Sequence, residues 1–354
     1  MALPFHWIIR RELRSVLNKV LLKIVRLDAN FDKIDPENIN RILLVRLNYR
    51  IGNILFMTPL LRAIETLMPH VKVDMLIGAA YIKPIVKDMP NVNNVYDAPR
   101  KLLKSPIQLI KFANKLNKNN YDIVISPVNG SVSSNIALLL LKSPIKLGIY
   151  NKDSYSPLNR FVYPKKEYKH SALQPLAIMD IFTQEKEYNK YLDIALSKDE
   201  KEFGKNYLDN LLKDNNIEKT DKKIIAIFKD ARNDKKIPNS WWIEYIDNIS
   251  KKDKNIVFID ILNPNETKPL KDGMLYLKEK NLRILGSIFS AFDRFICADT
   301  GPMHLASASL VPVIALFNIT SPDTFGPLGK NDKVLMINDQ DIDLLCTKTI
   351  QMIL

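Results

Sequence analysis

Cysteine and histidine are scarce in this chain of 354 residues, which holds two cysteines and four histidines. Two cysteines cannot build the disulfide framework of a small secreted protein, so the composition favours a reducing compartment. The histidines are scattered and no carboxylate cluster has the spacing of metal ligands, so we expect no metal site. No apolar run reaches the roughly 18–20 residues needed to cross a bilayer.

Three active-site signatures are missing as well. The sequence contains no Gly-x-Gly-x-x-Gly dinucleotide motif, no nucleotide P-loop and no Gly-x-Ser-x-Gly nucleophile elbow. The chain is therefore not expected among the classes of enzyme that these motifs define.

Positive charge is the main compositional bias. Lysine and arginine total 52 against 39 acidic residues, a formal net charge of +13. A phosphorylated small molecule, an acidic membrane surface and a nucleic acid all fit this sign, although dispersed lysines also make an ordinary solvated surface. No basic motif interleaved with aromatic residues supports nucleic-acid binding, so we expect none.

Residues 1–35 are predicted to form a basic amphipathic helix. Apolar residues recur at helical spacing from Phe5 to Leu27, with six basic residues among them. The segment lacks the uninterrupted apolar region and the small-residue cleavage site of a signal peptide. Such a helix can lie on an anionic membrane or pack on the body of the protein, and both interpretations stay open.

Strand and helix patterns alternate along the rest of the chain in two series. Strands are expected at 41–47, 71–77, 121–126 and 145–149, and again at 223–228, 256–261, 295–298 and 313–317, with helical patterns between them. This order predicts two doubly wound, Rossmann-like α/β domains, 36–185 and 186–335, whose parallel sheets face an interdomain cleft. Residues 336–354 are predicted to form a C-terminal helix.

The most informative motif runs from Asp299 to Leu305 and begins Asp-Thr-Gly. It joins an apolar strand pattern to a helix, so free backbone N–H groups, the Thr300 hydroxyl and the His304 imidazole would surround one anion-sized space. This is chemistry for holding a phosphorylated ligand. Thr300 and Gly301 suit that contact better than Asp299, because like charges repel.

A basic loop, 229–238, follows the predicted strand at 223–228. It contains Arg232, Lys235 and Lys236, and a lysine point charge with a bidentate arginine suits a diphosphate. Taken alone, the loop is explained slightly better as a solvated charged surface.

The turn after the first strand offers Arg46, Arg50, Gly52 and Asn53. A glycine suits a place where backbone approaches a ligand closely, and a plain strand–helix turn explains the same residues equally well.

Together these motifs resemble those of glycosyltransferase family 9, the ADP-heptose:lipopolysaccharide heptosyltransferases. The likeness covers roughly residues 40–330 and rests on Ile42–Arg46 with Arg50–Asn53, on Thr58–Ala63, on Lys235–Pro238, and on Asp299–Ala306 with Val311–Phe317.

The resemblance implies a GT-B fold, with the acceptor on the N-terminal domain and the nucleotide-sugar on the C-terminal domain. It also implies an inverting, metal-independent transfer without a cofactor, in which the enzyme neutralises the leaving diphosphate and deprotonates the attacking hydroxyl. GT-B folds often return a C-terminal helix to the first domain, which we expect of residues 336–354. The implied residues are Arg232, Lys235 (also catalytic), Lys236, Asp299, Thr300, Gly301 and His304 for the donor, and Arg46, Arg50 and Gly52 for the acceptor.

One position departs from the family pattern in a way that bears on catalysis. Asn53 stands where the family has the aspartate expected to be the general base, and an amide does not usefully accept a proton at neutral pH. Another carboxylate could serve, Asn53 could only position the acceptor, or the chain could be a weakly active or inactive relative. Ile237 and residues 318–320 also differ from the family pattern, so the donor sugar could differ from heptose.

The sequence thus predicts a glycosyltransferase that moves a sugar, with ADP-heptose as the expected donor, onto a lipopolysaccharide core or another anionic surface glycan. We expect it in the cytoplasm, with peripheral contact to the inner membrane as an option of the basic N-terminal helix. The alternative, motivated by Asn53, is a non-catalytic protein that binds a nucleotide-sugar or a glycan.

Overall fold

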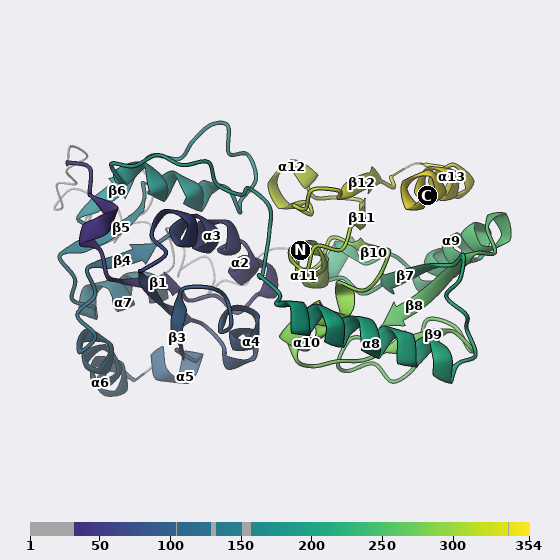
Figure 1. Ribbon diagram of the computed structural model, residues 1–354, viewed down its shortest axis with the longest axis horizontal. Coiled ribbons are helices and arrows are strands. Elements are labelled where there is room, and N and C mark those ends of the chain that lie inside the picture. The colour runs from purple at the N-terminus through teal and green to yellow at the C-terminus, as the bar shows by residue number, and fades with distance from the viewer. Residues whose placement is uncertain (1–31, 104, 129–131, 151–156, 339) are drawn as a thin grey trace, which may run out of the picture.

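The computed structural model describes residues 32–103, 105–128, 132–150, 157–338 and 340–354. Two α/β domains lie side by side, and each contains a six-stranded parallel sheet (Figure 1). The helix predicted between Phe5 and Leu27 lies outside the described residues. Within the described part of the chain, no helix is both long and apolar enough to span a bilayer.

The sheet of the N-terminal domain has the strand order β3-β2-β1-β4-β5-β6. Neighbouring residues of β1 belong to different apolar clusters: Leu44 packs with α2, α3 and α4, and Leu43 packs with α6 and α7. Both faces of the sheet are therefore covered, which explains why its central strands are continuous apolar runs. The strands are β1 (Arg41–Arg46), β2 (Lys72–Ile77), β3 (Val92–Asp97), β4 (Ile123–Ser126), β5 (Ile145–Ile149) and β6 (Arg160–Val162).

Most helices of this domain connect strands that run in the same direction, one 3-10 helix precedes the first strand, and another follows the last strand. They are η1 (Pro36–Asn38), α2 (Ile51–Leu55), α3 (Thr58–Leu67), η2 (Ala80–Ile82), α4 (Lys83–Val86), α5 (Arg100–Leu103), α6 (Pro106–Asn117), α7 (Val132–Leu140) and η3 (Gln174–Ile181). The expected boundary between the domains, 185/186, falls between η3 and the first helix of the second domain.

The second sheet has the order β12-β11-β10-β7-β8-β9, the same topology as the first. Its strands are β7 (Lys223–Phe228), β8 (Ile256–Ile261), β9 (Leu275–Leu277), β10 (Arg294–Ala298), β11 (Val313–Phe317) and β12 (Lys333–Met336). Its helices are α8 (Lys198–Asp214), η4 (Asn233–Lys235), α9 (Asn239–Lys252), α10 (Leu282–Phe289), α11 (Gly301–Ala308), α12 (Pro322–Phe325) and α13 (Ile342–Ile353).

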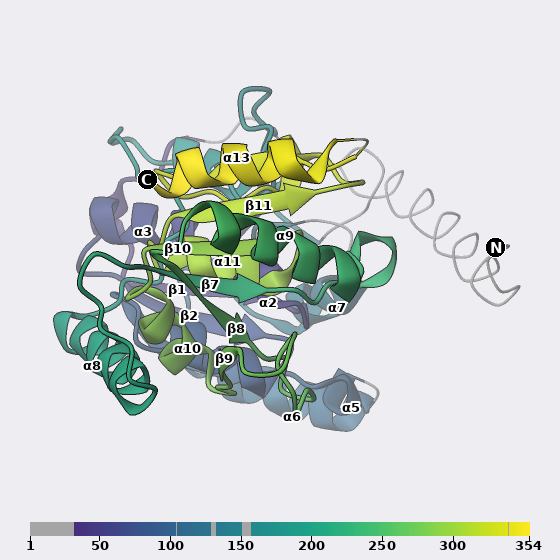
Figure 2. The same cartoon turned by 90° about the vertical axis from the view of Figure 1, so that its right-hand side faces the viewer.

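The C-terminal helix differs from its expected position. We expected residues 336–354 to return to the N-terminal domain, whereas α13 lies beside α9 on the second sheet (Figure 2). Leu345, Cys346 and Ile353 are buried there in one cluster with Trp242 and Tyr245 of α9. This apolar stripe needs a partner, and the face of the nearby sheet supplies it.

Candidate active site

Three loops converge at the carboxyl edge of the second sheet. They follow β7, β10 and β11, which are neighbours in the sheet, so their first residues lie close together. The Lys235 ammonium pairs with the Asp299 carboxylate, Nζ to Oδ2 2.5 Å, and the Thr320 hydroxyl donates to the same oxygen. Asp299 is only 7% exposed, so these two donors, rather than water, stabilise its negative charge. The sequence predicted Lys235 and Asp299 for one site, and the structure brings them together.

His304 lies in the first turn of α11, shortly after Asp299 in the sequence. It is buried, with only 6% of its surface exposed. Its pKa is lowered to about 3, first by burial and then by the nearby His170, with Asp299 acting in the opposite direction. The imidazole is therefore neutral at physiological pH. Its Nδ1 is buried without a hydrogen-bond partner among the described residues, which leaves hydrogen-bonding capacity for a ligand.

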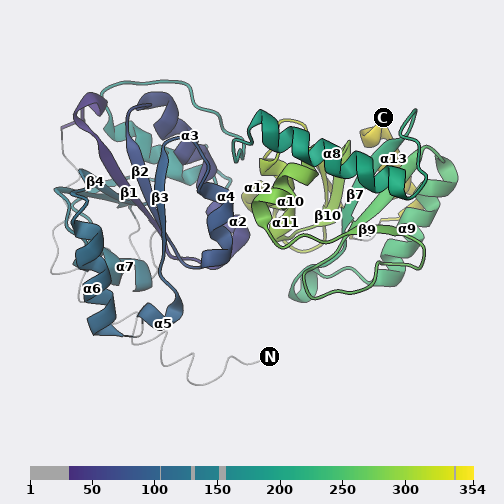
Figure 3. The same ribbon diagram turned by 60° about the horizontal axis from the view of Figure 1, so that its bottom comes forward.

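The N-terminal domain meets this site through α2. A Cβ on Gly52 would lie 2.7 Å from His304 Cδ2, so the two helices approach at a distance that only glycine permits. Phe56 lies edge-on to the His304 ring, with 4.7 Å between ring centroids, and edge-on to the His170 ring, at 5.3 Å. Asn53 follows Gly52 in α2, the helix of the N-terminal domain that contacts α11 at the domain boundary (Figure 3).

The two arginines of the first turn have different environments. Arg46 donates from Nε to the Asn53 carbonyl at 3.3 Å, and burial lowers its pKa to about 10. It therefore braces the start of α2 from the end of β1. The Arg50 backbone N–H bonds to the Asn48 side chain, and the Arg50 side chain is exposed.

Arg232 and Lys236 lie at the rim of the site. Arg232 comes close enough to Tyr81 of the N-terminal domain for its charge to oppose the effect of burial, which raises the pKa of Tyr81. Lys236 is exposed and lies 3.8 Å from Asp230. These two cations therefore face solvent or the opposite domain, whereas Lys235 points into the carboxylate cluster.

Sequence reasoning missed Thr320 as a member of the site and misjudged the environment of Lys229. Thr320 counted only as a departure from the family pattern, although its place after β11 already puts it at the right edge of the sheet. Lys229 counted among the solvated basic residues of its loop. In the structure it is buried and pairs with Asp260 at 3.0 Å and with Glu266 at 3.2 Å. The polar Asp260 inside the apolar strand β8 was the available signal.

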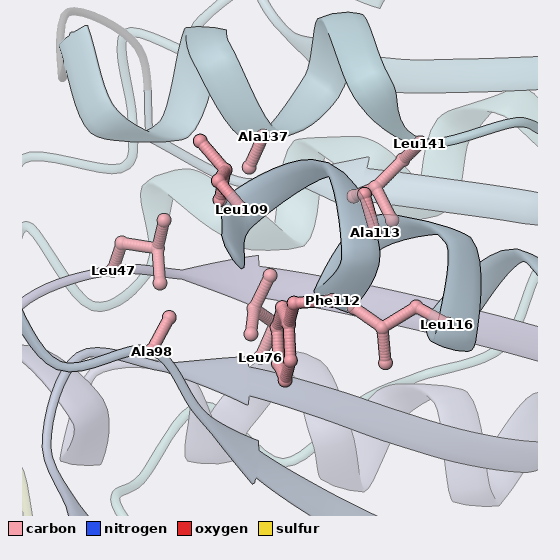
Figure 4. A pocket seen from close by; sticks show the side chains of 9 residues that line it. All are labelled: Leu47, Leu76, Ala98, Leu109, Phe112, Ala113, Leu116, Ala137 and Leu141. Carbon is pink, nitrogen blue, oxygen red and sulfur yellow. The ribbon is translucent and has the colours of Figure 1, made fainter. Parts of the chain in front are cut away.

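An apolar recess lies away from this chemistry, between α6, α7 and the first sheet (Figure 4). Only apolar side chains line it, so it offers nothing to a phosphate. No group of three or more metal-ligating side chains gathers among the described residues.

Two domains with parallel sheets of the same topology that meet at a shared boundary define the GT-B architecture. The model of glycosyltransferase family 9 (heptosyltransferase) matches residues 109–349, and the chain belongs to that family. The chain is 27% identical over 317 residues to lipopolysaccharide heptosyltransferase 3 of Escherichia coli, covering 79% of this chain and 83% of that protein. It is 26% identical over 313 residues to lipopolysaccharide heptosyltransferase 1 of the same species, covering 83% and 92%.

Solved structures confirm the fold. A glycosyl transferase family 9 protein from Veillonella parvula superposes with a TM-score of 0.72 at 17% identity, over 90% of this chain and 91% of that one. The E. coli heptosyltransferase WaaC with ADP superposes with a TM-score of 0.68 at 21% identity, over 88% and 98%. Family membership supports glycosyl transfer in lipopolysaccharide biosynthesis.

Proposed function

We propose that this enzyme transfers heptose from ADP-heptose to a lipopolysaccharide core, with inversion and without a metal ion. The observation that carries the proposal is the convergence of Lys235, Asp299, Thr320 and His304 at the start of α11, opposite α2. The relatives named above are lipopolysaccharide heptosyltransferases, and one solved neighbour holds ADP.

In the proposed step, an acceptor hydroxyl attacks the anomeric carbon from the side of α2. The bond from that carbon to the diphosphate oxygen breaks, its electron pair leaves on the diphosphate, and the hydroxyl proton passes to a base. Lys235 and the backbone N–H groups at the start of α11 supply positive potential where the leaving charge develops. These groups do the work that a metal ion would otherwise do.

Asp299 has a positioning role in this proposal. Its carboxylate holds the Lys235 ammonium in place before the donor arrives, and Thr320 fixes the carboxylate in turn. An ammonium whose position is already set loses less freedom when the diphosphate binds.

The experiment compares two neighbouring lysines in an assay with ADP-heptose and a heptose-deficient lipopolysaccharide acceptor. Lys235→Ala should lower kcat about 100-fold or more, because it removes the charge that faces the leaving group. Lys236→Ala is the comparison variant: the family resemblance implies this lysine for the donor as well, whereas the structure places its ammonium at the exposed rim, 3.8 Å from Asp230, so the rate should stay within about threefold of the wild type. EDTA should leave the wild-type rate unchanged.

Equal losses in the two variants would contradict the assignment of Lys235. Transfer that fails with every nucleotide-sugar, while calorimetry detects nucleotide-sugar binding, would favour the alternative of a weakly active or non-catalytic relative that Asn53 suggests. Transfer from a different nucleotide-sugar would keep the site and change the donor.

A further inference from the structure

Two helices of the N-terminal domain expose large aliphatic side chains to solvent. Ile107 and Ile110 of α6 and Leu139 of α7 are 69%, 47% and 61% exposed. Ile136 of α7 is exposed as well. Scattered exposed aliphatics need no explanation, whereas these four stand on two helices that contact each other. We call these outward faces the α6–α7 surface.

The two helices lie next to each other on one side of the first sheet (Figure 3). The Asn117 side chain at the end of α6 donates to the Leu140 carbonyl at the end of α7, at 3.0 Å. The opposite sides of both helices are buried against the sheet, where Leu109 and Ala137 line the apolar recess (Figure 4). The exposed aliphatics are thus not needed for the core of the domain.

Positive charge accompanies this surface. Between Asp97 and Asp122 the sequence has no acidic residue and six basic ones: Arg100, Lys101, Lys104, Lys111, Lys115 and Lys118. Lys111 and Lys115 are exposed and form no ion pair within the described part of the chain. In a helix, residue 107 lies on the same side as residues 110 and 111, so isoleucine and lysine share one outward face.

The positive charge of the α6–α7 surface indicates which kind of partner binds there. The N-terminal segment of residues 1–31 carries six basic and two acidic residues, so it has the same sign as the surface. A second copy of the chain would likewise present like charge to like charge. A bilayer with anionic headgroups offers both an apolar interior for the isoleucines and negative charge for the lysines.

We propose that the α6–α7 surface docks on an anionic lipid bilayer. The proposal deepens the proposed function, on which it rests for the lipid-linked acceptor. Both helices follow strands of a parallel sheet, so they begin at its carboxyl edge, the edge at which Arg46 and α2 face the donor site. Docking by this surface brings the acceptor headgroup to that edge.

The test measures binding of the full chain to sedimented vesicles, without donor or acceptor. Vesicles of phosphatidylglycerol with phosphatidylethanolamine are compared with vesicles of phosphatidylcholine alone. Ile107→Ser/Ile110→Ser should reduce binding to the anionic vesicles about tenfold, because the apolar contact is lost. Lys111→Gln/Lys115→Gln should reduce it about tenfold or more and weaken its salt dependence.

Matched variants control for general loss of apolar surface and of charge. Leu344→Ser/Leu354→Ser changes two exposed leucines at the C-terminal end of the chain, and Lys201→Gln/Lys205→Gln changes two exposed lysines with the same spacing on α8. Both should bind like the wild type. Thermal unfolding of every variant checks that the fold is kept.

Unchanged binding by the α6–α7 variants would overturn the proposal, and so would a wild type that ignores anionic vesicles. A change of oligomeric state in those variants alone would overturn it too, by assigning the surface to a protein contact. In the transfer assay, the α6–α7 variants should lose rate with acceptor in vesicles and keep it with a deacylated, soluble acceptor. Failure of the proposed function would instead abolish transfer to both acceptors and leave vesicle binding intact.

Discussion

Asn53 stands at the position where the family resemblance implies the general base. It lies on α2, one residue after the glycine whose Cβ would meet the His304 ring, so it belongs to the helix that contacts α11 across the domain boundary. An amide there can hold a hydroxyl but cannot take its proton. By contrast, the residues that the family resemblance implies for the donor are present in this chain.

Restoring a carboxylate at this position is therefore informative. Asn53→Asp should raise kcat about tenfold or more, since a positioned base contributes at least that much. Steady-state kinetics with saturating ADP-heptose measure the effect, and Asn53→Ala, which adds no base, should give no gain. An unchanged or lower rate for Asn53→Asp would assign the proton to another group.

His304 makes stability depend on pH. Its folded pKa of about 3 lies below its ordinary value of 6.5 because the ring is buried, so the unfolded chain binds the extra proton first as pH falls. This contribution to stability is complete above about pH 6.5 and is lost as pH falls toward 3. His170, whose pKa burial also lowers, acts in the same direction.

We expect the free energy of unfolding to fall by about 2 kcal/mol between pH 8 and pH 5 through His304 alone. Urea unfolding at the two pH values measures this. His304→Gln removes the titrating group and should reduce the difference by that amount; an identical pH dependence in wild type and variant would contradict the burial argument.

At the scale of elements, the pairing of α2 with α11 depends on a glycine, Gly52, at their contact. Gly52→Ala would place a Cβ 2.7 Å from a carbon of the His304 ring, which is itself packed against Phe56 and cannot move freely. We expect a loss of about 1–3 kcal/mol of stability and a lower kcat, because the two helices must separate.

Gly301→Ala serves as the control for stability. A Cβ there would meet Ile51 Cβ at 3.5 Å, an ordinary contact, so its melting temperature should stay near that of the wild type. Equal melting temperatures for Gly52→Ala and Gly301→Ala would show that the α2–α11 contact is looser than the distances indicate.

The elements that sequence patterns missed share a place in the fold. All eight predicted strands form, and they are the four central strands of each sheet. The four missed strands, β3, β6, β9 and β12, are the sheet edges. Edge strands are partly solvated, as the exposed Asn93 and Asn94 of β3 illustrate, so they lack the apolar runs that mark buried strands.

At the scale of the whole molecule, Arg283 ties the domains together. This buried side chain of α10 forms a bidentate pair with Glu200 of α8, Nε to Oε1 2.6 Å and Nη2 to Oε2 2.7 Å. It also donates to the Ile194 and Ala195 carbonyls of the connecting segment, and to the Ile85 carbonyl of α4 in the N-terminal domain. One guanidinium therefore joins both domains and the segment between them.

Arg283→Met should lower the free energy of unfolding by about 2–4 kcal/mol, because it leaves the Glu200 carboxylate and the backbone carbonyls without their hydrogen-bond donor. It should also lower kcat, since the domains lose a contact that sets their register. A double-mutant cycle with Glu200→Gln measures how much of the loss belongs to the ion pair. If the loss in Arg283→Met equals that in Glu200→Gln, the bonds from Arg283 to the three backbone carbonyls contribute nothing.

The local motifs made much of the site predictable. Asp299, His304 and Lys235 stood out because each follows a strand pattern, and parallel strands bring their carboxyl ends to one edge. Thr320 could be placed at that edge but not on the Asp299 carboxylate. Pairings such as that of Lys229 with Asp260 depend on side-chain directions that spacing along one strand does not specify.

By itself, the sequence determined the two Rossmann-like units and their central strands, because hydrophobic periodicity is a local property. Only the tertiary structure decided that α13 stays on its own domain, that Lys229 turns inward, and that Gly52 and Arg283 join the two halves. Those contacts link residues far apart in sequence, and close packing selects them only when both partners are in place.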